Sequence, residues 1–488
     1  MAFNSYGFLF LFLPILLFAV WGIQKEKKEN FMIPGLVFAS VVFYAVAYPK
    51  SLIWLALSIS VTYVLHKSML SKPAAKKGRL IIGLIFHIGL LAFLKYGRVL
   101  WGFSGEFMNA PGVSFYTFTM LAFLVETYRG NIGETGVWNY ALYVTFFPKL
   151  LEGPIVLPKD FLEIKRKKLT WERAFRALFL VSFGLFKKVI LADTLGSAVD
   201  YGYANLSVLN SPDAVIVMLS YTLQLYFDFS GYCDMGMGIA SLVGFDLPVN
   251  FDSPYQATDI VDFWRRWHIT LTQFFTQYVY IPLGGNRKGK ARTYLNYLIV
   301  FFISGLWHGV GFTFIIWGLM HGGLFAVTRF VKDRKKNRVI QTKDDKVVAM
   351  PKRGGIVQGI SVFFTFLYVN VAWVFFRASN VKEAVTLLKK IATGGIGKLN
   401  WNLAGCFNLD ELWYILKVLK IAPWGYAQYI WMFVILLGLL LWVLFGKNAI
   451  WLSKKVKPKL LTVMIMVVFF FWSILSFSGV NTYLYMNF

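Results

Sequence analysis

His308 is the residue of this chain whose type and surroundings best suit proton transfer. It lies in the apolar segment FFISGLWHGVGFTFIIWG, between Gly305 and Gly309. A neutral imidazole can accept a hydroxyl proton near physiological pH and return it, and small neighbours would let the backbone approach a ligand closely. The same local pattern also fits a core histidine that donates to a carbonyl. We therefore treat His308 as a candidate general base.

A second polar cluster lies in DIVDFWRRWHITLTQF, residues 259–274. It contains Trp264, Arg265, Arg266, Trp267 and His268. The stretch is too short and too polar to span a bilayer, which favours a half-buried re-entrant or interfacial helix. Its two guanidinium groups suit phosphates or carboxylates as bidentate donors. Snorkelling of both arginines beside an aromatic belt is the alternative.

Further charged residues flank this cluster. The turn YIPLGGNRKGKAR carries four cations that could hold a phosphate-bearing cytosolic donor: Arg287, Lys288, Lys290 and Arg292. Its Gly-Gly pair is a weak phosphate-loop signal, and no Walker pattern is present. Upstream, Asp228 and Asp234 stand near the end of an apolar run. They could polarise a histidine or cap helix ends.

Motifs for metals and for serine nucleophiles are absent from the sequence. There is no H-E-x-x-H, no C-x-x-C, no carboxylate cluster and no G-x-S-x-G, so we expect no metal site. Cys233 and Cys406 are too few for a disulfide framework and could form at most one bridge. Of the other histidines, His66 beside Lys67 is interpreted as interfacial and His87 as a helix-packing residue.

Membrane helices must position these residues. Of the 488 residues, 57% are hydrophobic and 15% are charged, and apolar runs recur along the whole chain. This composition excludes a multi-domain soluble enzyme, a disordered chain, collagen and a coiled coil. The first apolar run has no basic residue before it and no cleavage site after it, which indicates an uncleaved first span.

The apolar runs predict about 11 to 13 membrane-embedded helices in an all-α polytopic protein. Runs long enough to span are 7–22, 31–48, 51–66, 80–95, 112–128, 177–196, 213–232, 356–376, 428–446 and 460–479. Segment 294–330 should form two short spans that turn near residues 309–311. Segment 137–158 contains prolines and charges and should be a broken, re-entrant element. Residues 378–425 are amphipathic and are expected along the outer membrane surface.

The net charge of +26 is explained by the membrane and not by nucleic acid. Of the 50 lysines and arginines, 34 lie in six short breaks between apolar runs: 23–30, 66–79, 159–176, 286–292, 329–353 and 447–459. The alternating breaks 197–213 and 479–488 hold none. This asymmetry predicts that the six basic breaks face the cytoplasm, against anionic lipid, with both termini outside.

Together these motifs resemble the membrane-bound O-acyltransferase family, in the bacterial branch typified by the membrane subunit of alginate O-acetylation. The resemblance rests on FFPKLLEGPIVLPKDF, YFDFSGYCDMGMGIASLVGFDLPVNFDSPYQATDIVDFWRRWH and YIPLGGNRKGKARTYLNYLIVFFISGLWHGVGFTFIIWGLMHG, in that order. It implies that His308 is the family's essential histidine and that His268 is the second characteristic polar position, so both are candidate catalytic residues. His321 matches a histidine often seen in this branch. The same motifs contain eight candidates for binding substrate or donor: Asp228, Asn250, Trp264, Arg265, Arg266, Trp267, Arg287 and Trp307.

The resemblance also implies a fold, a reaction and partners. The expected fold is one domain over 1–488, with a catalytic core in 1–330, a cytoplasmic linker at 331–355 and C-terminal helices in 356–488, arranged around a central tunnel. The expected reaction moves acetyl from cytosolic acetyl-CoA, or another acyl thioester, to an extracytoplasmic polysaccharide, without a permanently bound cofactor. A secreted or periplasmic SGNH-type acetyltransferase or esterase and polysaccharide machinery are the implied partners, in a bacterial plasma membrane.

Two departures and three alternatives stay open. Residues 272–278 read TQFFTQY where this branch usually has an Arg-Asp pair, and Glu152 replaces an expected small or neutral residue before Gly153-Pro154. The donor, acceptor or partner could therefore differ. D-alanyl transfer to teichoic acid is the alternative within the class, since that relative shares the W-x-x-W-H and W-H-G elements. A glycan or lipid transporter and a silent scaffold are the alternatives from other classes.

Overall fold

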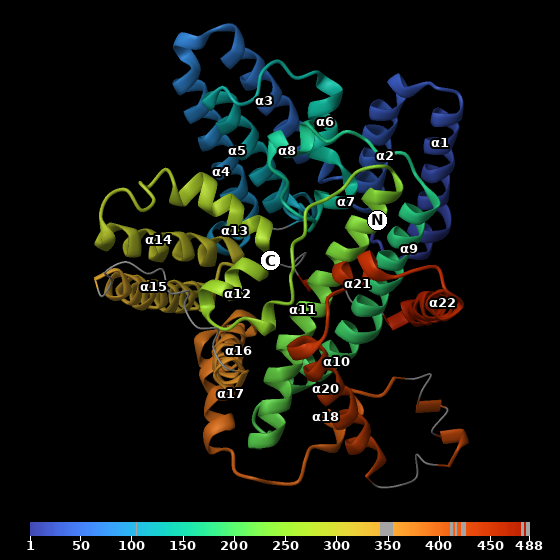
Figure 1. Ribbon diagram of the computed structural model, residues 1–488, viewed down its shortest axis with the longest axis vertical. Helices are drawn as coiled ribbons and strands as arrows, with labels where there is room; N and C mark the ends of the chain where they lie inside the picture. The colour runs from blue at the N-terminus through green and yellow to red at the C-terminus, as the bar shows by residue number, and fades with distance from the viewer. Residues whose placement is uncertain are drawn as a thin grey trace. The chain divides into compact units, whose positions relative to one another are not determined.

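The computed structural model describes residues 1–103, 105–341, 355–409, 413–414, 417–420, 426–479 and 483–484 of the chain. Every regular element in these ranges is helical (Figure 1). Such a structure satisfies backbone hydrogen bonds within each segment, which a bilayer demands of any spanning element. The all-α class expected from the apolar runs is therefore confirmed.

Seven helical stretches of the described chain are long and apolar enough to cross a membrane. They are Gly7–Lys25, Glu29–Ala47, Leu52–Ser71, Pro73–Gly97, Phe312–Arg334, Gly355–Arg377 and Ala427–Phe445. They contain helices α1 (Leu13–Lys25), α2 (Met32–Ala47), α3 (Leu52–Ser71), most of α4 (Lys76–Trp101), α15 (Phe312–Gln341) in part, α16 (Gly355–Arg377) and α20 (Ala427–Phe445). The chain is a multi-pass membrane protein, and the total of 11 to 13 embedded helices stays a prediction.

One compact unit comprises residues 1–189, 229–249 and 449–488. Besides α1 to α4 it contains α5 (Val113–Arg129), α6 (Val137–Thr145), α7 (Phe147–Leu150), α8 (Pro158–Leu162), α9 (Trp171–Leu185), α21 (Ala449–Lys455) and α22 (Leu460–Leu475). The predicted break in segment 137–158 is present, because α6 ends at Thr145 and residues 154–157 have no regular structure.

Two histidines lie fully buried among α3, α4 and α5 of this unit. The Nδ1 atom of His66 is 2.9 Å from Oγ1 of Thr127 on α5, and Nε2 of His87 is 2.7 Å from Oγ1 of Thr62 on α3. The packing role predicted for His87 is confirmed. His66 is buried because α5 covers the face of α3 that carries it, and its interfacial depth in the membrane stays a prediction.

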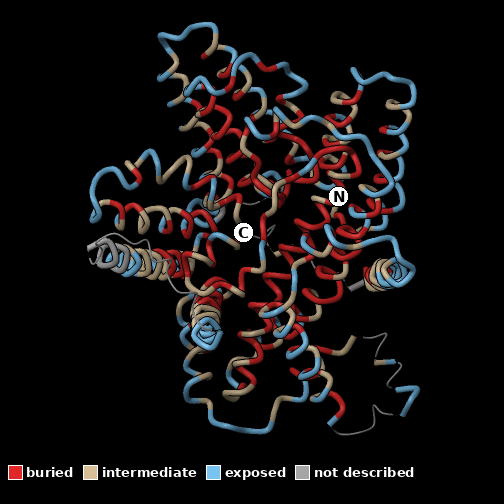
Figure 2. The backbone as a smooth tube through the Cα atoms, in the orientation of Figure 1, coloured by how far each residue is buried: buried red, intermediate tan, exposed pale blue. Residues whose placement is uncertain are grey.

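The other compact unit comprises residues 190–228 and 250–448. It contains α10 (Asp193–Ala204), α12 (Ile260–Arg266), α13 (Ile269–Phe275), α14 (Lys290–His308), α15, α16, α17 (Val381–Thr393), α18 (Trp401–Gly405) and α20. Helix α11 (Ser211–Leu242) begins in this unit and is buried along most of its length (Figure 2). The predicted span 177–196 belongs to a longer helical stretch, from α9 through the wider turn Phe186–Ala192 into α10.

Helix α15 continues to Gln341, so the first part of the predicted linker 331–355 is helical. Residues 342–354 of that linker lie outside the described residues. In the predicted surface segment 378–425, α17 buries Leu387 and exposes Lys389, which confirms its amphipathic character. Residues 410–412, 415–416 and 421–425 of that segment also lie outside the described ranges.

Helices α14 and α15 form the close-packed hairpin that was predicted to turn at residues 309–311. A Cβ atom on Gly305 would lie 2.4 Å from the carbonyl oxygen of Phe314, and one on Gly318 would lie 2.4 Å from that of Phe301. Small residues therefore let the two helices approach, as they commonly do in membranes. The proposed use of Gly305 and Gly309 for close approach of a ligand is not what the structure shows, since Phe314 of α15 occupies that space.

Candidate active site

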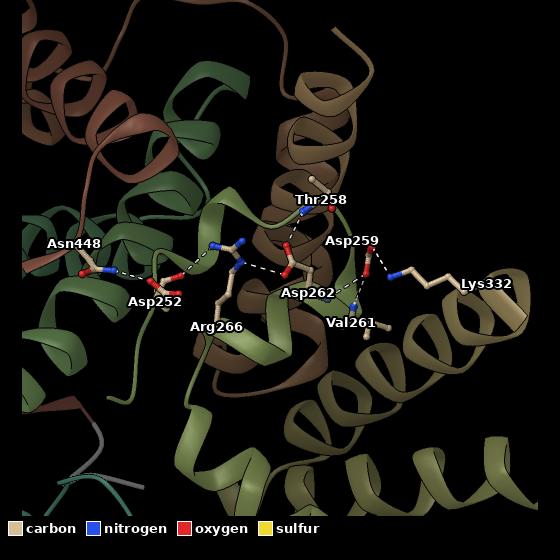
Figure 3. Close-up of polar contacts among 8 residues, drawn as sticks. All are labelled: Asp252, Thr258, Asp259, Val261, Asp262, Arg266, Lys332 and Asn448. Carbon is tan, nitrogen blue, oxygen red and sulfur yellow. Dashed lines mark hydrogen bonds and ion pairs between the residues drawn. The ribbon is translucent and has the colours of Figure 1, made fainter. Parts of the chain in front are cut away.

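The W-R-R-W-H segment folds as two short helices with a sharp break between them. Asp259 caps α12, because its Oδ1 accepts from the backbone N–H groups of Val261 at 3.0 Å and Asp262 at 3.1 Å. Its Oδ2 pairs with Nζ of Lys332 on α15 at 2.7 Å (Figure 3). Burial alone would raise the pKa of Asp259, but the hydrogen bonds from Lys332, Asp262 and Val261 hold this pKa below its ordinary value.

His268 stands at the break and adopts a left-handed backbone conformation with φ of 44°. A non-glycine residue in this region is strained by about 1–3 kcal/mol, and such strain clusters at functional sites. The surrounding structure must hold the residue there. The backbone N–H of Ile269 donates to the carbonyl oxygen of Asn250 at 3.0 Å, which ties the break to the loop before α12.

Asn250 also sets the protonation of the His268 ring. Its Oδ1 accepts from the backbone N–H of Thr270 at 3.3 Å, from Oγ1 of Thr270 at 2.9 Å, and lies 3.2 Å from Nδ1 of His268. A backbone N–H can only donate, so the atom facing Thr270 is the amide oxygen and Nδ1 of His268 carries a proton. In the neutral ring Nε2 is then the basic nitrogen. Asn250 and His268 are both buried.

The two arginines of the segment point to different partners. Arg266 donates from Nε to Oδ1 of Asp262 at 3.1 Å and from Nη1 to the carbonyl of Asp252 at 3.3 Å. Asp252 in turn accepts from Asn448 at 2.8 Å (Figure 3). Arg266 therefore holds α12 against the preceding loop. Arg265 is exposed and lines a separate pocket, so the two guanidinium groups do not act as one anion-binding pair.

His308 is the last residue of α14 and is buried. Its ring lies 4.4 Å from that of Trp307, 4.9 Å from that of Trp317 on α15 and 5.0 Å from that of Phe376 on α16. Three elements thus converge on one imidazole in apolar surroundings. The placement fits a base that works in surroundings from which most water is excluded.

His321 lies on α15 and is fully buried. Its Nδ1 accepts a hydrogen bond from the indole N–H of Trp264 at 3.3 Å. An indole nitrogen can only donate, so Nε2 carries the proton of the neutral His321 ring. The ring of His321 also lies 5.0 Å from that of Trp317, which contacts His308. His321 therefore acts on the position of its aromatic neighbours.

Aromatic rings connect the two predicted catalytic histidines. From His308 the contacts pass through Phe376, Trp373, Trp267 and Phe251 to His268, with ring centroids 5.0 to 6.4 Å apart at each step. The structure thus places Trp264, Trp267, Trp307 and both histidines around one aromatic cluster. Asp228 is buried on α11.

The basic turn forms the N-terminal approach to α14. Gly284, Gly285 and Gly289 have φ of 109°, 54° and 85°, values that favour glycine. The side-chain amide of Asn296 donates to the carbonyl of Gly285 at 2.9 Å and holds the turn against the helix. Arg287, Lys288 and Lys290 are exposed, and Arg292 is half-buried.

Buried charges in the unit of residues 1–189, 229–249 and 449–488 were not anticipated as a group. Nζ of Lys187 pairs with Oδ2 of Asp234 at 2.8 Å, with both side chains about 5% exposed or less. Lys149 and Glu152 are also buried. Asp234 therefore pairs with a lysine, where a histidine contact or a helix cap was predicted. The signal was present in the sequence, since Lys187 interrupts the apolar run SFGLFKKVILA.

Among the described residues no group of three or more His, Cys, Asp or Glu side chains could hold a metal ion. No disulfide joins Cys233 and Cys406, both of which lie among the described residues.

Comparison with known proteins adds a family and several relatives. The family model "MBOAT, membrane-bound O-acyltransferase family" matches residues 52–375. The chain is 38% identical over 430 residues to a peptidoglycan O-acetyltransferase of Helicobacter pylori, covering 79% of each chain. It is 32% identical over 456 residues to a probable alginate O-acetylase of Pseudomonas aeruginosa, covering 88% of this chain and 82% of that one. A teichoic acid D-alanyltransferase of Bacillus subtilis is 25% identical over 350 residues, covering 67% and 86%.

Proposed function

This chain belongs to the membrane-bound O-acyltransferase family and is an O-acyltransferase, and from that premise we propose that it transfers an acetyl group to a hydroxyl of an extracytoplasmic polysaccharide. The observation that carries the proposal is the buried His308, enclosed by α14, α15 and α16 within a chain whose relatives include peptidoglycan and alginate O-acetylating proteins.

The proposed reaction is one addition and one elimination at the acyl carbon. The acceptor hydroxyl oxygen attacks the thioester carbonyl carbon as the imidazole of His308 removes the hydroxyl proton. The C–S bond then breaks, and the same imidazole returns the proton to the leaving sulfur. A sugar hydroxyl is too weak an acid to ionise unaided near neutral pH, so a base within about 3 Å should contribute a rate factor of about 10² to 10⁴.

His268 takes a positioning role in this proposal. Its Nδ1 proton is held by Asn250, and its backbone occupies the break between α12 and α13. Trp264, Trp267 and Trp307 form walls around the path of the acyl group, and Asp228 contributes polarity from α11. His268→Ala should therefore reduce transfer less than His308→Ala.

The donor is proposed to be acetyl-CoA or another cytosolic acyl thioester, whose phosphates lie near the exposed cations of the turn before α14. The positive-inside pattern supports this side of the membrane for the turn. Arg287→Gln, Lys288→Gln, Lys290→Gln and Arg292→Gln together should raise the apparent donor KM several-fold with little loss of folded protein. The matched control replaces four exposed cations, Lys454, Lys455, Lys457 and Lys459, with Gln.

Donor saturation should be unchanged in that control. Equal donor KM in the quadruple variant and the wild type would show that the turn contacts only lipid.

The proposal also includes a setting and partners. A bacterial plasma membrane, polysaccharide machinery and a secreted or periplasmic SGNH-type acetyltransferase or esterase would complete delivery to the polymer. The relatives' roles in peptidoglycan and alginate O-acetylation support a polysaccharide-modification system of this kind.

D-alanyl transfer is the second candidate, and the similarity to teichoic acid D-alanyltransferases favours it as an alternative donor chemistry. The chain is 25–26% identical to those D-alanyltransferases and 32–38% identical to the O-acetylating relatives, so acetyl transfer is the first candidate. Offering acetyl-CoA and a D-alanyl carrier protein to the same preparation distinguishes the two donors.

The decisive experiment measures single-turnover transfer from acetyl-CoA to a hydroxyl acceptor in proteoliposomes. His308→Ala should lose transfer by about 10² to 10⁴-fold or more while the protein still inserts and purifies. The matched control is His87→Gln on α4. Its side-chain amide can still form a hydrogen bond with Thr62 on α3, and transfer should be close to wild type. Near-normal transfer by His308→Ala would make the histidine structural and refute the mechanism proposed here.

A further inference from the structure

A pocket of about 220 Å³ lies in the unit of residues 190–228 and 250–448, between the α12–α13 segment and the α14–α15 hairpin. Its lining includes two guanidinium groups, Arg265 and Arg329, and the phenols of Tyr280 and Tyr297, whose hydroxyl oxygens lie 3.4 Å apart. The other lining residues are mostly apolar and include Trp264, Phe275 and Phe301. The pocket is therefore amphipathic, with two cationic groups in a largely apolar lining.

Among the described residues, two carboxylates near these arginines pair with other cations. Asp262 pairs with Arg266 and Asp259 pairs with Lys332, whereas Asp333 accepts a hydrogen bond from the neutral hydroxyl of Tyr294 and keeps its own charge. Figure 3 shows Asp259 and Asp262 directed to those partners. In the described part of the chain, Arg329 has no hydrogen-bond partner at its buried Nε, and its guanidinium lies over the ring of Phe325 at 5.6 Å.

Such an arrangement is suited to an anion that brings its own apolar chain. Two arginines can donate in pairs to phosphate oxygens. The pocket body has ring walls in contact with one another, from Tyr297 through Phe325 and Phe301 to Trp264, at centroid separations of 4.9, 5.5 and 5.1 Å. An extended acyl chain could cover these rings, whereas a free inorganic anion would leave them in water.

The surroundings of the pocket indicate the bilayer as the source of that ligand. Leu295, Phe302 and Leu306 of α14 and Val327 and Phe330 of α15 are exposed and apolar, so the outer faces of the hairpin face lipid. Arg329 is the first residue of the basic run 329–353, and Tyr297 follows the basic turn before α14; the positive-inside pattern assigns both basic segments to the cytoplasmic side. The part of the pocket that Arg329 lines then lies at the level of the anionic headgroups of the inner leaflet.

We propose that this pocket binds one anionic phospholipid of the cytoplasmic leaflet, with its phosphate on Arg265 and Arg329 and an acyl chain against Phe275, Phe301 and Phe325. The acyl chain of the lipid would end near Trp264. The indole of Trp264 donates to His321 and packs against Trp317, which in turn contacts His308. The lipid thus fills the outer side of the aromatic cluster. This inference concerns Arg265, one of the residues first considered for the donor, and it does not depend on which acyl group is transferred.

The test compares retention of phosphatidylglycerol and phosphatidylcholine by the full chain, using native mass spectrometry and thermal unfolding after delipidation and lipid return. The wild type should retain more phosphatidylglycerol than phosphatidylcholine, and its Tm should rise only when phosphatidylglycerol is returned. Replacing both arginines, Arg265→Gln and Arg329→Gln, should remove that preference, at about tenfold or more in affinity for each charge-assisted bond lost. The matched control, Lys454→Gln with Lys455→Gln, removes two exposed cations elsewhere and should keep it.

Two further variants keep the proposal testable if the double variant folds poorly. Arg329→Lys retains the charge without the guanidinium fork and should bind phosphatidylglycerol with intermediate affinity. Val300→Trp retains both arginines but fills the pocket from α14, and it should also lose the lipid.

Equal retention of the two lipids by the wild type would overturn the proposal. So would unchanged phosphatidylglycerol preference in both the double arginine variant and Val300→Trp. If the double variant retains lipid normally but needs far more acetyl-CoA for half-saturation, the pocket serves the thioester donor and the lipid assignment is wrong.

Discussion

At the scale of single residues, one amide oxygen holds three groups of the candidate site. Oδ1 of Asn250 accepts hydrogen bonds from the backbone N–H and the hydroxyl of Thr270 and from the protonated Nδ1 of His268. An acceptor shared in this way both satisfies buried donors and fixes one tautomer of the histidine. The residue therefore connects the stability of the α12–α13 break with the orientation of the imidazole.

Asn250→Leu should consequently lower both stability and transfer. Removing the acceptor leaves buried donors unsatisfied, at a cost of about 1–3 kcal/mol each, and the ring of His268 loses its orientation. Thr270→Val is the matched control, since it removes one hydroxyl donor and leaves the His268 contact in place. Tm in detergent and single-turnover transfer are the measurements. Equal behaviour of the two variants would show that Asn250 has only a structural role.

At the scale of elements, the α14–α15 hairpin presents His308 to the site. Gly305 lies one turn before His308 on α14 and packs against α15, where Gly318 fills the matching position. The two helices can approach this closely because Gly305 and Gly318 have no Cβ atom. Any increase in their separation displaces His308 from Trp317 and Phe376, its neighbours on α15 and α16.

Gly305→Ala and Gly318→Ala should each destabilise the protein by about 1–3 kcal/mol through overpacking and reduce transfer at the same time. Gly323→Ala on the same helix is the control, because a Cβ atom there meets nothing within 4 Å. That substitution should be neutral or stabilise α15 by up to about 1 kcal/mol. Thermal unfolding and transfer rates decide the matter. Wild-type values for Gly305→Ala would refute the close-packing account.

At the scale of the whole molecule, the distribution of cations predicts orientation in the membrane. The basic turn at 286–292 and the basic run at 447–459 should face the cytoplasm, and α17 should lie outside. The prediction concerns the side of the bilayer and is independent of the catalytic assignment.

Single-cysteine labelling in intact cells tests this orientation, after Cys233 and Cys406 are replaced. Lys288→Cys and Lys455→Cys should react with an impermeant maleimide only after the membrane is opened, whereas Val385→Cys on α17 should react in intact cells. All three positions are exposed in the structure, so differences in reactivity report sidedness. Labelling of Lys288→Cys from outside would refute the topology.

Much of the site was accessible from the sequence because its signals are local. Hydropathy and spacing along the chain were sufficient for the helical class, the interruption at 137–158 and the turn at 309–311, since each depends on residues adjacent in sequence. The histidine at 308 was singled out by its apolar context and by the motif around it. The roles of His308 and His268 in transfer stay predictions.

Only the tertiary structure decided which side chains meet. Adjacent Arg265 and Arg266 look equivalent in sequence, yet one joins Asp262 and Asp252 and the other lines a pocket with Arg329, 64 positions away. His66 is buried because α5 covers it, and Gly305 is small because α15 packs on it. The physical reason is that hydropathy determines whether a helix enters the membrane, whereas the partner of each face depends on packing between segments far apart in the chain.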